Sequence, residues 1–335
     1  MITPFSRKLT GWLLALATAG ITHLGAQSVR LATLAPTGAS AHKSLAKMGA
    51  AWSKAGVRTT IYADGKMGGE SQMVRRIRLG QIQAAALTAQ GMAVIDESVK
   101  SLQMLPMLFR SLDEYDHVLA RIAPEIEAKF REKGFEVLFW SDLGYVQFFS
   151  KEEAHRIEDF RKMKMFVWSG DTQMQSLMKT LGMHGVPLEQ TEGLTGLQTG
   201  LVDMATTAPI YALAGQFYRT ANHMLKINWA PLSGGLVFDK RVWDRLPAAR
   251  QQALRAAANQ AGKEIRQYGR HESELAVDAM SKRGLKVIEP TQEDLEDWYQ
   301  FAQTVYPEIR GKIVPPEIFD HIQTLVKEYR AGAGK

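Results

Sequence analysis

The chain has no cysteine among its 335 residues. This absence excludes disulfide bonds, thiolate metal sites, iron–sulfur clusters, cysteine nucleophiles and an acylated cysteine anchor. An excess of one charge is also missing, because 41 lysines and arginines stand against 35 acidic residues and the formal net charge is only +6. The basic residues are dispersed along the chain, so charge does not indicate a nucleic-acid partner.

Motifs for catalysis or cofactor binding are missing as well. The sequence contains no HExxH, GxSxG, P-loop or GxGxxG pattern. The eight histidines are scattered without ligand spacing, which favours surface or capping roles over a metal site. We therefore expect no enzyme activity, no metal and no other cofactor.

The most apolar stretch lies close to the N-terminus. Arg7 and Lys8 precede an apolar run over residues 9–21, and Leu24-Gly25-Ala26 offers a cleavage point. This order is typical of an export signal. We expect residues 1–26 to be a signal peptide cleaved near Ala26 and the mature protein to be periplasmic. An uncleaved anchor is the alternative, although the run is short for a bilayer span.

The first part of the mature chain alternates strands with helices. Strands are predicted over 29–34, 57–62 and 83–87, with helical segments around 45–52 and from Glu70 to Leu79 between them. This β-α-β-α-β order predicts a mostly parallel sheet covered by helices. Ligands of such sheets bind at the carboxyl ends of the strands.

The remaining residues are enough for a second domain. Further strands are predicted over 136–140, 146–150, 165–168, 204–207 and 236–239, and helices over 115–133 and 173–181. An alanine-rich stretch from about Pro247 to Ser281 is too long for an average globular helix, so we expect it to cross both lobes. The tail over 293–329 is predicted to be helical, with breaks at Pro307, Pro315 and Pro316. No flexible linker separates the two parts, which favours two lobes around a hinged cleft.

Six motifs occur in a fixed order along the chain. They are GGESQM at 68–73, LPMLF at 105–109, DFRKMK at 159–164, LQTGLVD at 197–203, TANH at 220–223 and WDRLP at 243–247. Together they resemble the solute-binding proteins of TRAP transporters (tripartite ATP-independent periplasmic, the DctP family). The fourth is the most specific, since it nearly matches that family's LQTGxVD.

The resemblance implies an α/β fold of the two-lobed periplasmic-binding-protein type, with mixed, mostly parallel sheets and a long helix spanning both lobes. It implies ligand capture in the interlobe cleft by hinge closure, delivery to TRAP membrane permease subunits, and no catalysis. On this basis we expect residues 27–143 with about 232–260 to form lobe I. Residues 144–231 with about 261–335 would form lobe II.

The chain departs from the family at two arginine positions. The family has an arginine two residues after the 159–164 stretch, where this chain has Phe166, and commonly another two residues after Gly144, where it has Val146. An arginine fork grips a carboxylate with two charge-assisted hydrogen bonds. We therefore expect an apolar or amphipathic ligand. An organic acid held by a cation from elsewhere, such as Arg75 or Arg219, is the alternative.

The ligand-binding residues follow from the same comparison. On spacing alone, Phe166 and Val146 suit a strand core, and only the resemblance places them in the cleft. Four methionines (163, 165, 174 and 178) suit a core, and flexible thioethers also suit an adaptable pocket. We expect the ligand to be bound by Val146, Phe166, Trp168, Leu34, Thr88 and Phe148, with Gln147, Gln190, Thr206 and Thr207 as polar orienting residues.

Two other functions compete with a transport receptor. One is a periplasmic hydrophobe or lipid carrier that acts with a tetratricopeptide-repeat scaffold protein and no permease. The other is an enzyme on a periplasmic-binding-like fold, which would show ionisable residues with shifted pKa values in the cleft.

Overall fold

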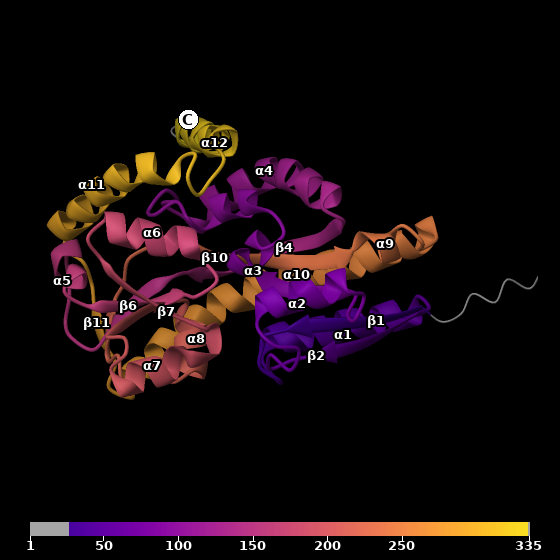
Figure 1. Cartoon of the computed structure of the whole chain (residues 1–335), viewed down its shortest axis with the longest axis horizontal. Coiled ribbons are helices and arrows are strands. Elements are labelled where there is room, and N and C mark those ends of the chain that lie inside the picture. The colour runs from indigo at the N-terminus through magenta and orange to yellow at the C-terminus, as the bar shows by residue number, and fades with distance from the viewer. Residues whose placement is uncertain (1–26, 334–335) are drawn as a thin grey trace, which may run out of the picture.

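The computed structural model describes residues 27–333, and within them the strands form two sheets (Figure 1). The expected signal peptide, residues 1–26, lies outside the described residues. The first sheet holds, in spatial order, β2 (Val57–Tyr62), β1 (Gln27–Thr33), β3 (Ala84–Thr88), β10 (Pro231–Asp239) and β4 (Phe135–Tyr145). The second holds β11 (Lys286–Ile288), β9 (His223–Leu225), β5 (Gln147–Ser150), β8 (Met204–Thr207), β6 (Lys164–Trp168) and β7 (His184–Leu188).

Helices cover both sheets and connect their strands. The longer ones are α1 (Ser40–Lys54), α2 (Glu70–Arg78), α4 (Leu112–Glu132), α6 (Thr172–Thr180), α10 (Ala248–Ser281), α11 (Gln292–Ile309) and α12 (Pro316–Ala333). The shorter ones are α3 (Ala89–Ala93), η1 (Glu97–Leu102), α5 (Ile157–Arg161), η2 (Gln190–Glu192), α7 (Gly193–Thr199), α8 (Pro209–Ala214), η3 (Phe217–Arg219) and α9 (Lys240–Trp243).

The first sheet begins with the expected β-α-β-α-β unit. β1 pairs in parallel with both β2 and β3, whereas β10 runs antiparallel between β3 and β4. Helix α1 forms because its apolar residues recur at three- and four-residue spacing, which places Leu45, Met48 and Trp52 on one buried face. The indole of Trp52 donates a hydrogen bond to the Leu254 carbonyl at 3.0 Å, so α1 is also fixed to α10.

The second sheet is mixed in the same way. β6 is parallel to β7 and β8, and β9 to β11, whereas β5 is antiparallel to β8 and β9. Over both sheets five pairings of described strands are parallel and four are antiparallel. The prediction of mixed, mostly parallel sheets is therefore confirmed by a small majority.

The long helix α10 joins the two parts of the molecule. Its 34 residues span about 51 Å at 1.5 Å per residue. It packs on α1 and β4 and also on α8 and β11 (Figure 1). The Arg270 guanidinium binds both Asp142 on β4 and Asp116 on α4, at 2.7 Å in each case. The predicted helix across both sheets is confirmed.

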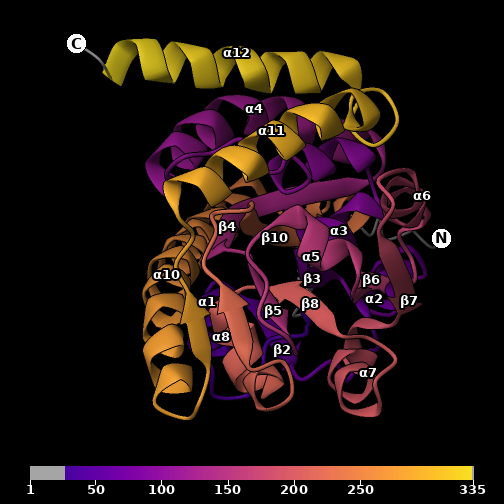
Figure 2. The same ribbon diagram turned by 90° about the vertical axis from the view of Figure 1, so that its left-hand side faces the viewer.

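The C-terminal tail consists of two helices. The expectation that Pro307 breaks the helix is wrong, because Pro307 lies inside α11. Its missing N–H removes one hydrogen bond of the last turn, and the helix ends two residues later at Ile309. Pro316 begins α12, a position that suits proline. Helix α12 lies across α4 (Figure 2), and Arg330 binds Glu114 at 2.7 Å. No helix within residues 27–333 combines the length and the apolar character needed to cross a membrane.

Candidate ligand-binding site

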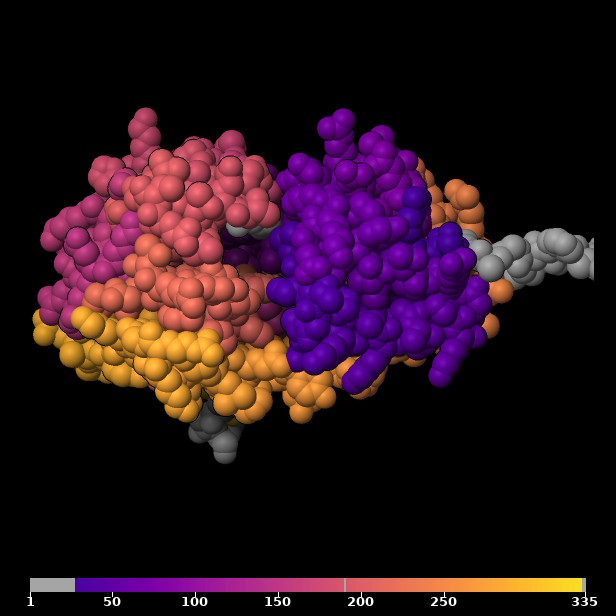
Figure 3. Space-filling view, turned by 90° about the horizontal axis from the view of Figure 1, so that it is seen from below, coloured from indigo at the N-terminus to yellow at the C-terminus, as the bar shows by residue number. Residues whose placement is uncertain are grey.

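A cavity of about 630 Å³ lies between the two sheets and continues beneath α6 and α11. Figure 3 shows the surface hollowed between the N-terminal part, in indigo, and the pink segment of the second sheet and its helices. Pockets for small ligands usually measure about 300–1,000 Å³. The cavity is therefore large enough for one organic molecule.

The cavity lies at the carboxyl ends of parallel strands. Leu34 follows β1, Thr88 ends β3, Trp168 ends β6 and Thr207 ends β8, and all four line the cavity. Side chains at such ends face a crevice that no further strand residues fill. The strand order of each sheet thus brings residues from distant parts of the chain together.

Most of the expected site residues line this cavity. Gln147 does not, because it is buried and its Oε1 accepts a hydrogen bond of 2.7 Å from the backbone N–H of Ile227. The side chain of Gln190 lies outside what the structure describes. The expected residues that line the cavity are Leu34, Thr88, Val146, Phe148, Phe166, Trp168, Thr206 and Thr207.

Apolar residues that the sequence analysis did not select form the other walls. Helix α6 contributes Met174, Leu177 and Met178, and α11 contributes Trp298 and Phe301. Of the four methionines considered, Met163 is a core residue outside the lining and the other three line the cavity. The spacing of three and four residues on α6 could have indicated a shared face, but not whether that face covers a core or a cavity.

Aromatic rings stiffen the deep wall. The ring of Phe148 lies 5.2 Å from that of Trp229 and 5.3 Å from that of Trp298, and the two tryptophan rings are 5.7 Å apart. Such edge-to-face and tilted contacts are favourable beyond simple burial. Trp298 is also fixed by its indole N–H, which donates to the His155 carbonyl at 2.9 Å.

The described part of the cavity lining carries no positive charge. Among the described residues that line the cavity there is no lysine, arginine or histidine. Arg75 and Arg219, the two suggested replacements, are exposed and do not line it. Two carboxylates do, Asp64 and Asp171. Hydrogen bonds from the hydroxyl and backbone N–H of Thr37 hold the pKa of Asp64 below its usual value, so this side chain is negative.

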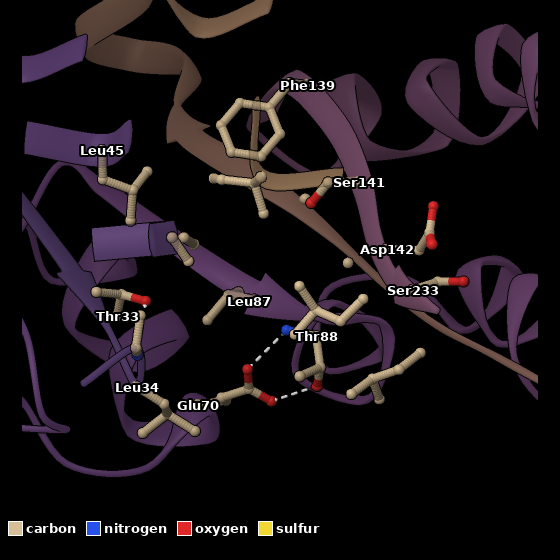
Figure 4. Close-up of a pocket in the computed structure, with 18 of the residues that line it drawn as sticks. Thr33, Leu34, Leu45, Glu70, Leu87, Thr88, Phe139, Ser141, Asp142 and Ser233 are labelled. Carbon is tan, nitrogen blue, oxygen red and sulfur yellow. Dashed lines mark hydrogen bonds between the residues drawn. The ribbon is translucent and has the colours of Figure 1, made fainter. Parts of the chain in front are cut away.

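A smaller chamber of about 70 Å³ adjoins the cavity, and the two share Leu34, Thr88, Tyr211 and Leu232 in their linings. Figure 4 shows Thr88 and Glu70 in this chamber. Its main polar group is Glu70, buried at the start of α2, whose oxygens accept hydrogen bonds of 2.6 Å from the N–H and hydroxyl of Thr88. Gly91 permits this approach, because a Cβ there would lie 2.5 Å from the carboxylate. Loss of hydration and the nearby Glu70 raise the pKa of Tyr211 to about 12, so its phenol remains protonated.

One ion pair closes the wall between η1 and α6. Lys100 Nζ lies 3.5 Å from Asp171 Oδ1, and both side chains are less than a tenth exposed. Lys100 also donates to Gln173, whose amide donates to Glu97 at 3.1 Å. Within the described residues no group of three or more potential ligands is placed to hold a metal ion.

Comparison with known proteins gives the same family as the sequence motifs. The family described as bacterial extracellular solute-binding protein, family 7 (DctP) matches residues 28–312. Among curated proteins, the uncharacterized protein YiiZ of Salmonella typhimurium is 29% identical over 152 residues. That match covers 44% of this chain and 46% of YiiZ, so the chain spans less than half the length of this relative.

Two solved structures of TRAP periplasmic solute-binding proteins share the fold. The protein from Xanthobacter autotrophicus, with bound β-D-galacturonate, has a TM-score of 0.81 at 22% identity. The protein from Chromohalobacter salexigens, with bound D-glucuronate, has a TM-score of 0.81 at 21% identity. Each comparison covers 89% of this chain and 99% of the other. The predicted two-lobed α/β fold is confirmed.

Proposed function

Because the chain belongs to the bacterial extracellular solute-binding proteins of family 7, we propose that it captures an apolar or amphipathic ligand in the cavity between its sheets and presents it to TRAP permease subunits. Receptors of this family bind small molecules, and their TRAP members act in the periplasm. The chemical nature of the ligand is our own inference.

One observation carries this proposal: the described lining has many apolar side chains and no cationic one. Closing a cavity over a carboxylate without a positive partner costs several kcal/mol. An arginine would add two charge-assisted hydrogen bonds of about 1.5–3 kcal/mol each, and Phe166 cannot make them. A carboxylate ligand is therefore disfavoured by roughly a thousandfold or more in affinity.

An apolar ligand needs no charged partner. Burial of about 300 Å² of ligand surface at about 25 cal/mol/Å² contributes roughly 7 kcal/mol before the costs of association. Val146, Phe166 and Trp168 would contact the apolar body, and Thr88, Thr206 and Thr207 would orient its polar group. Phe148 and Leu34 complete the contact, and we assign no ligand contact to Gln147.

We also propose the division into lobes at the boundaries given above. Helix α12 falls within the range proposed for lobe II, but it packs on α4 and η1, which that division gives to lobe I. A signal peptide over residues 1–26 fits a periplasmic receptor. A tetratricopeptide-repeat scaffold as an additional partner stays a prediction.

The sugar acids bound by the two structural neighbours favour a second candidate, an organic-acid receptor that uses an unusual cation. Native mass spectrometry of protein purified without added ligand, followed by solvent extraction, separates the two. We expect a copurified apolar or amphipathic molecule and no thermal shift with millimolar galacturonate, glucuronate or C4-dicarboxylates. A clear shift with one of these acids would overturn the proposal.

A further inference from the structure

The cavity passes through the second sheet rather than lying on one face of it. Strands β6 and β8 are parallel neighbours, but only Met165 and Met204 are paired between them. Both strands continue for three residues beyond this pair without further pairing to each other. Beyond that pair the two strands present facing edges to the cavity. Their backbone N–H and C=O groups are hydrogen-bonding groups that a bound molecule can use.

The lining residues support this geometry independently. Successive residues of a strand point to opposite faces of a sheet. Met165 packs in the core on one face, and Phe166 packs with the cluster on the other. Met183 and Leu177, which belong to the same core as Met165, line the cavity together with Ala205 and Phe217 from the cluster of Phe166. The cavity therefore reaches both faces of the sheet, and the unpaired ends of β6 and β8 lie between them.

The two ends of this passage differ in chemistry. The end between the sheets holds threonine hydroxyls, the Gln90 amide and the Asp64 carboxylate. The other end, which we call the apolar arm, lies beneath α6 and α11. It is lined by Ile157, Met165, Met174, Leu177, Met178, Leu181, Met183, Trp298, Phe301, Val305 and Ile309.

The apolar arm suits a flexible chain. Its methionines have unbranched thioether side chains that adapt to a mobile partner. Met174, Leu177 and Met178 on α6, with Leu181 directly after it, recur at spacings of three and four residues, a stripe that a packed helix would bury in a core. Here only Leu177 is fully buried within α6, so the stripe remains available to a ligand.

We propose that the ligand is a single-chain amphiphile, with its uncharged head between the sheets and its chain passing between β6 and β8 into the apolar arm. This inference rests on the proposed function and specifies its ligand class. An anionic head is disfavoured because the described lining offers acceptors and hydroxyls but no cation, and the threonine hydroxyls and the Gln90 amide suit an uncharged polar head. An amide or hydroxyl head can also bond to the open strand edges.

The test uses delipidated protein and two matched series, linear alkanamides and linear alkanoic acids of 6 to 16 carbons, each below its micellar concentration. Calorimetry measures Kd. Each added methylene should tighten amide binding by up to about fourfold until the arm is full, after which Kd should level off. The acid of equal length should bind at least tenfold more weakly at pH 7.

Two variants on α6 test whether the alkyl chain of the ligand lies in the apolar arm. Met178→Trp fills the arm and should weaken the longest amides by more than tenfold while leaving the shortest unchanged. Lys179→Trp, on the exposed side of α6, should leave the whole series unchanged. Retained binding of the short amides shows that Met178→Trp is folded.

Binding that does not depend on chain length, equal binding of acid and amide, or no effect of Met178→Trp on long amides would overturn this inference. If compact apolar molecules still bind with micromolar Kd, the proposed function stands and only the inference of a single-chain ligand is refuted. If sugar acids alone bind, both fail.

Discussion

Lys100 and Asp171 form a buried ion pair that ties η1, next to the first sheet, to the N-terminus of α6 on the second. The Asp171 carboxylate also accepts a hydrogen bond of 3.1 Å from the Met174 N–H and so caps α6. The Asp171 side chain therefore caps α6 and also fixes this helix to Lys100 on the opposite wall of the cavity. Because Asp171 lines the cavity, the pair helps to set the shape that a ligand meets.

Replacing Lys100 with methionine should destabilise the protein by about 3–5 kcal/mol, because it leaves the Asp171 carboxylate buried without its partner. Urea unfolding followed by circular dichroism measures the change. The double variant Lys100→Met with Asp171→Asn should recover much of the loss, since asparagine is uncharged and still caps the helix. Equal stability of the single variant and the parent would contradict a structural role for this pair.

The N-terminus of α11, which covers the apolar arm, should weaken in acid. The Thr291 hydroxyl and backbone N–H, together with Arg156, hold the pKa of Asp294 below its usual value. A carboxyl with a lowered folded-state pKa stabilises the protein above its unfolded value near 4, and this stability is lost as pH falls through the folded value. Stability measured from pH 6 to pH 2 should therefore decline below pH 4.

Asp294→Asn is the matched control for this pH dependence. Its amide oxygen can still accept from Thr291, but it does not titrate. The variant should be less stable than the parent at pH 6 and should show a shallower decline between pH 4 and pH 2. If the stability of the parent and of Asp294→Asn declined equally with falling pH, the acid sensitivity would belong to other carboxyl groups.

Two glycines on α10 should respond differently to alanine. A Cβ at Gly262 would lie 2.7 Å from Phe139 Cβ on β4, an atom close to the backbone that cannot turn away. A Cβ at Gly269 would first meet Leu143 Cδ2, the end of a flexible side chain. Gly262→Ala should cost about 1–3 kcal/mol through overpacking, beyond the helix preference for alanine. Gly269→Ala should cost less, and thermal unfolding of both variants tests the order.

Sequence reasoning reached the fold and the part of the cavity lined by the strands and their carboxyl ends. The order of the elements predicted only that a ligand binds at the carboxyl ends of the strands. Leu34 and Thr88 were placed there by the family resemblance, and Thr207 was named as a polar orienting residue. Val146 and Phe166 came from the family resemblance, because a strand core and a cleft wall call for the same residue types. Gln147 was expected to orient the ligand, but its amide oxygen accepts a hydrogen bond from the Ile227 backbone N–H.

The apolar arm could not be predicted for a physical reason. An amphipathic stripe such as Met174, Leu177 and Met178 has the same periodicity whether it packs against a core or covers a cavity. The sequence also does not indicate where the pairing of β6 with β8 ends. β-Branched and aromatic residues favour strands, but they do not determine which strand edges pair. Only the arrangement of α6 and α11 in space separates these outcomes.

Phe166→Arg tests whether the missing guanidinium decides the ligand class. An arginine in place of Phe166 would enter the cavity that Thr206 and Thr207 also line, and its guanidinium could donate two charge-assisted hydrogen bonds to a carboxylate. The variant should bind galacturonate or glucuronate at least a hundredfold more tightly than the parent and should lose affinity for the copurified ligand. Calorimetry with both ligand types measures the exchange. Phe166→Leu, which keeps the position apolar, should gain no acid binding. If the parent binds these acids as well as Phe166→Arg does, its cation comes from another residue and the preference for an uncharged ligand is wrong.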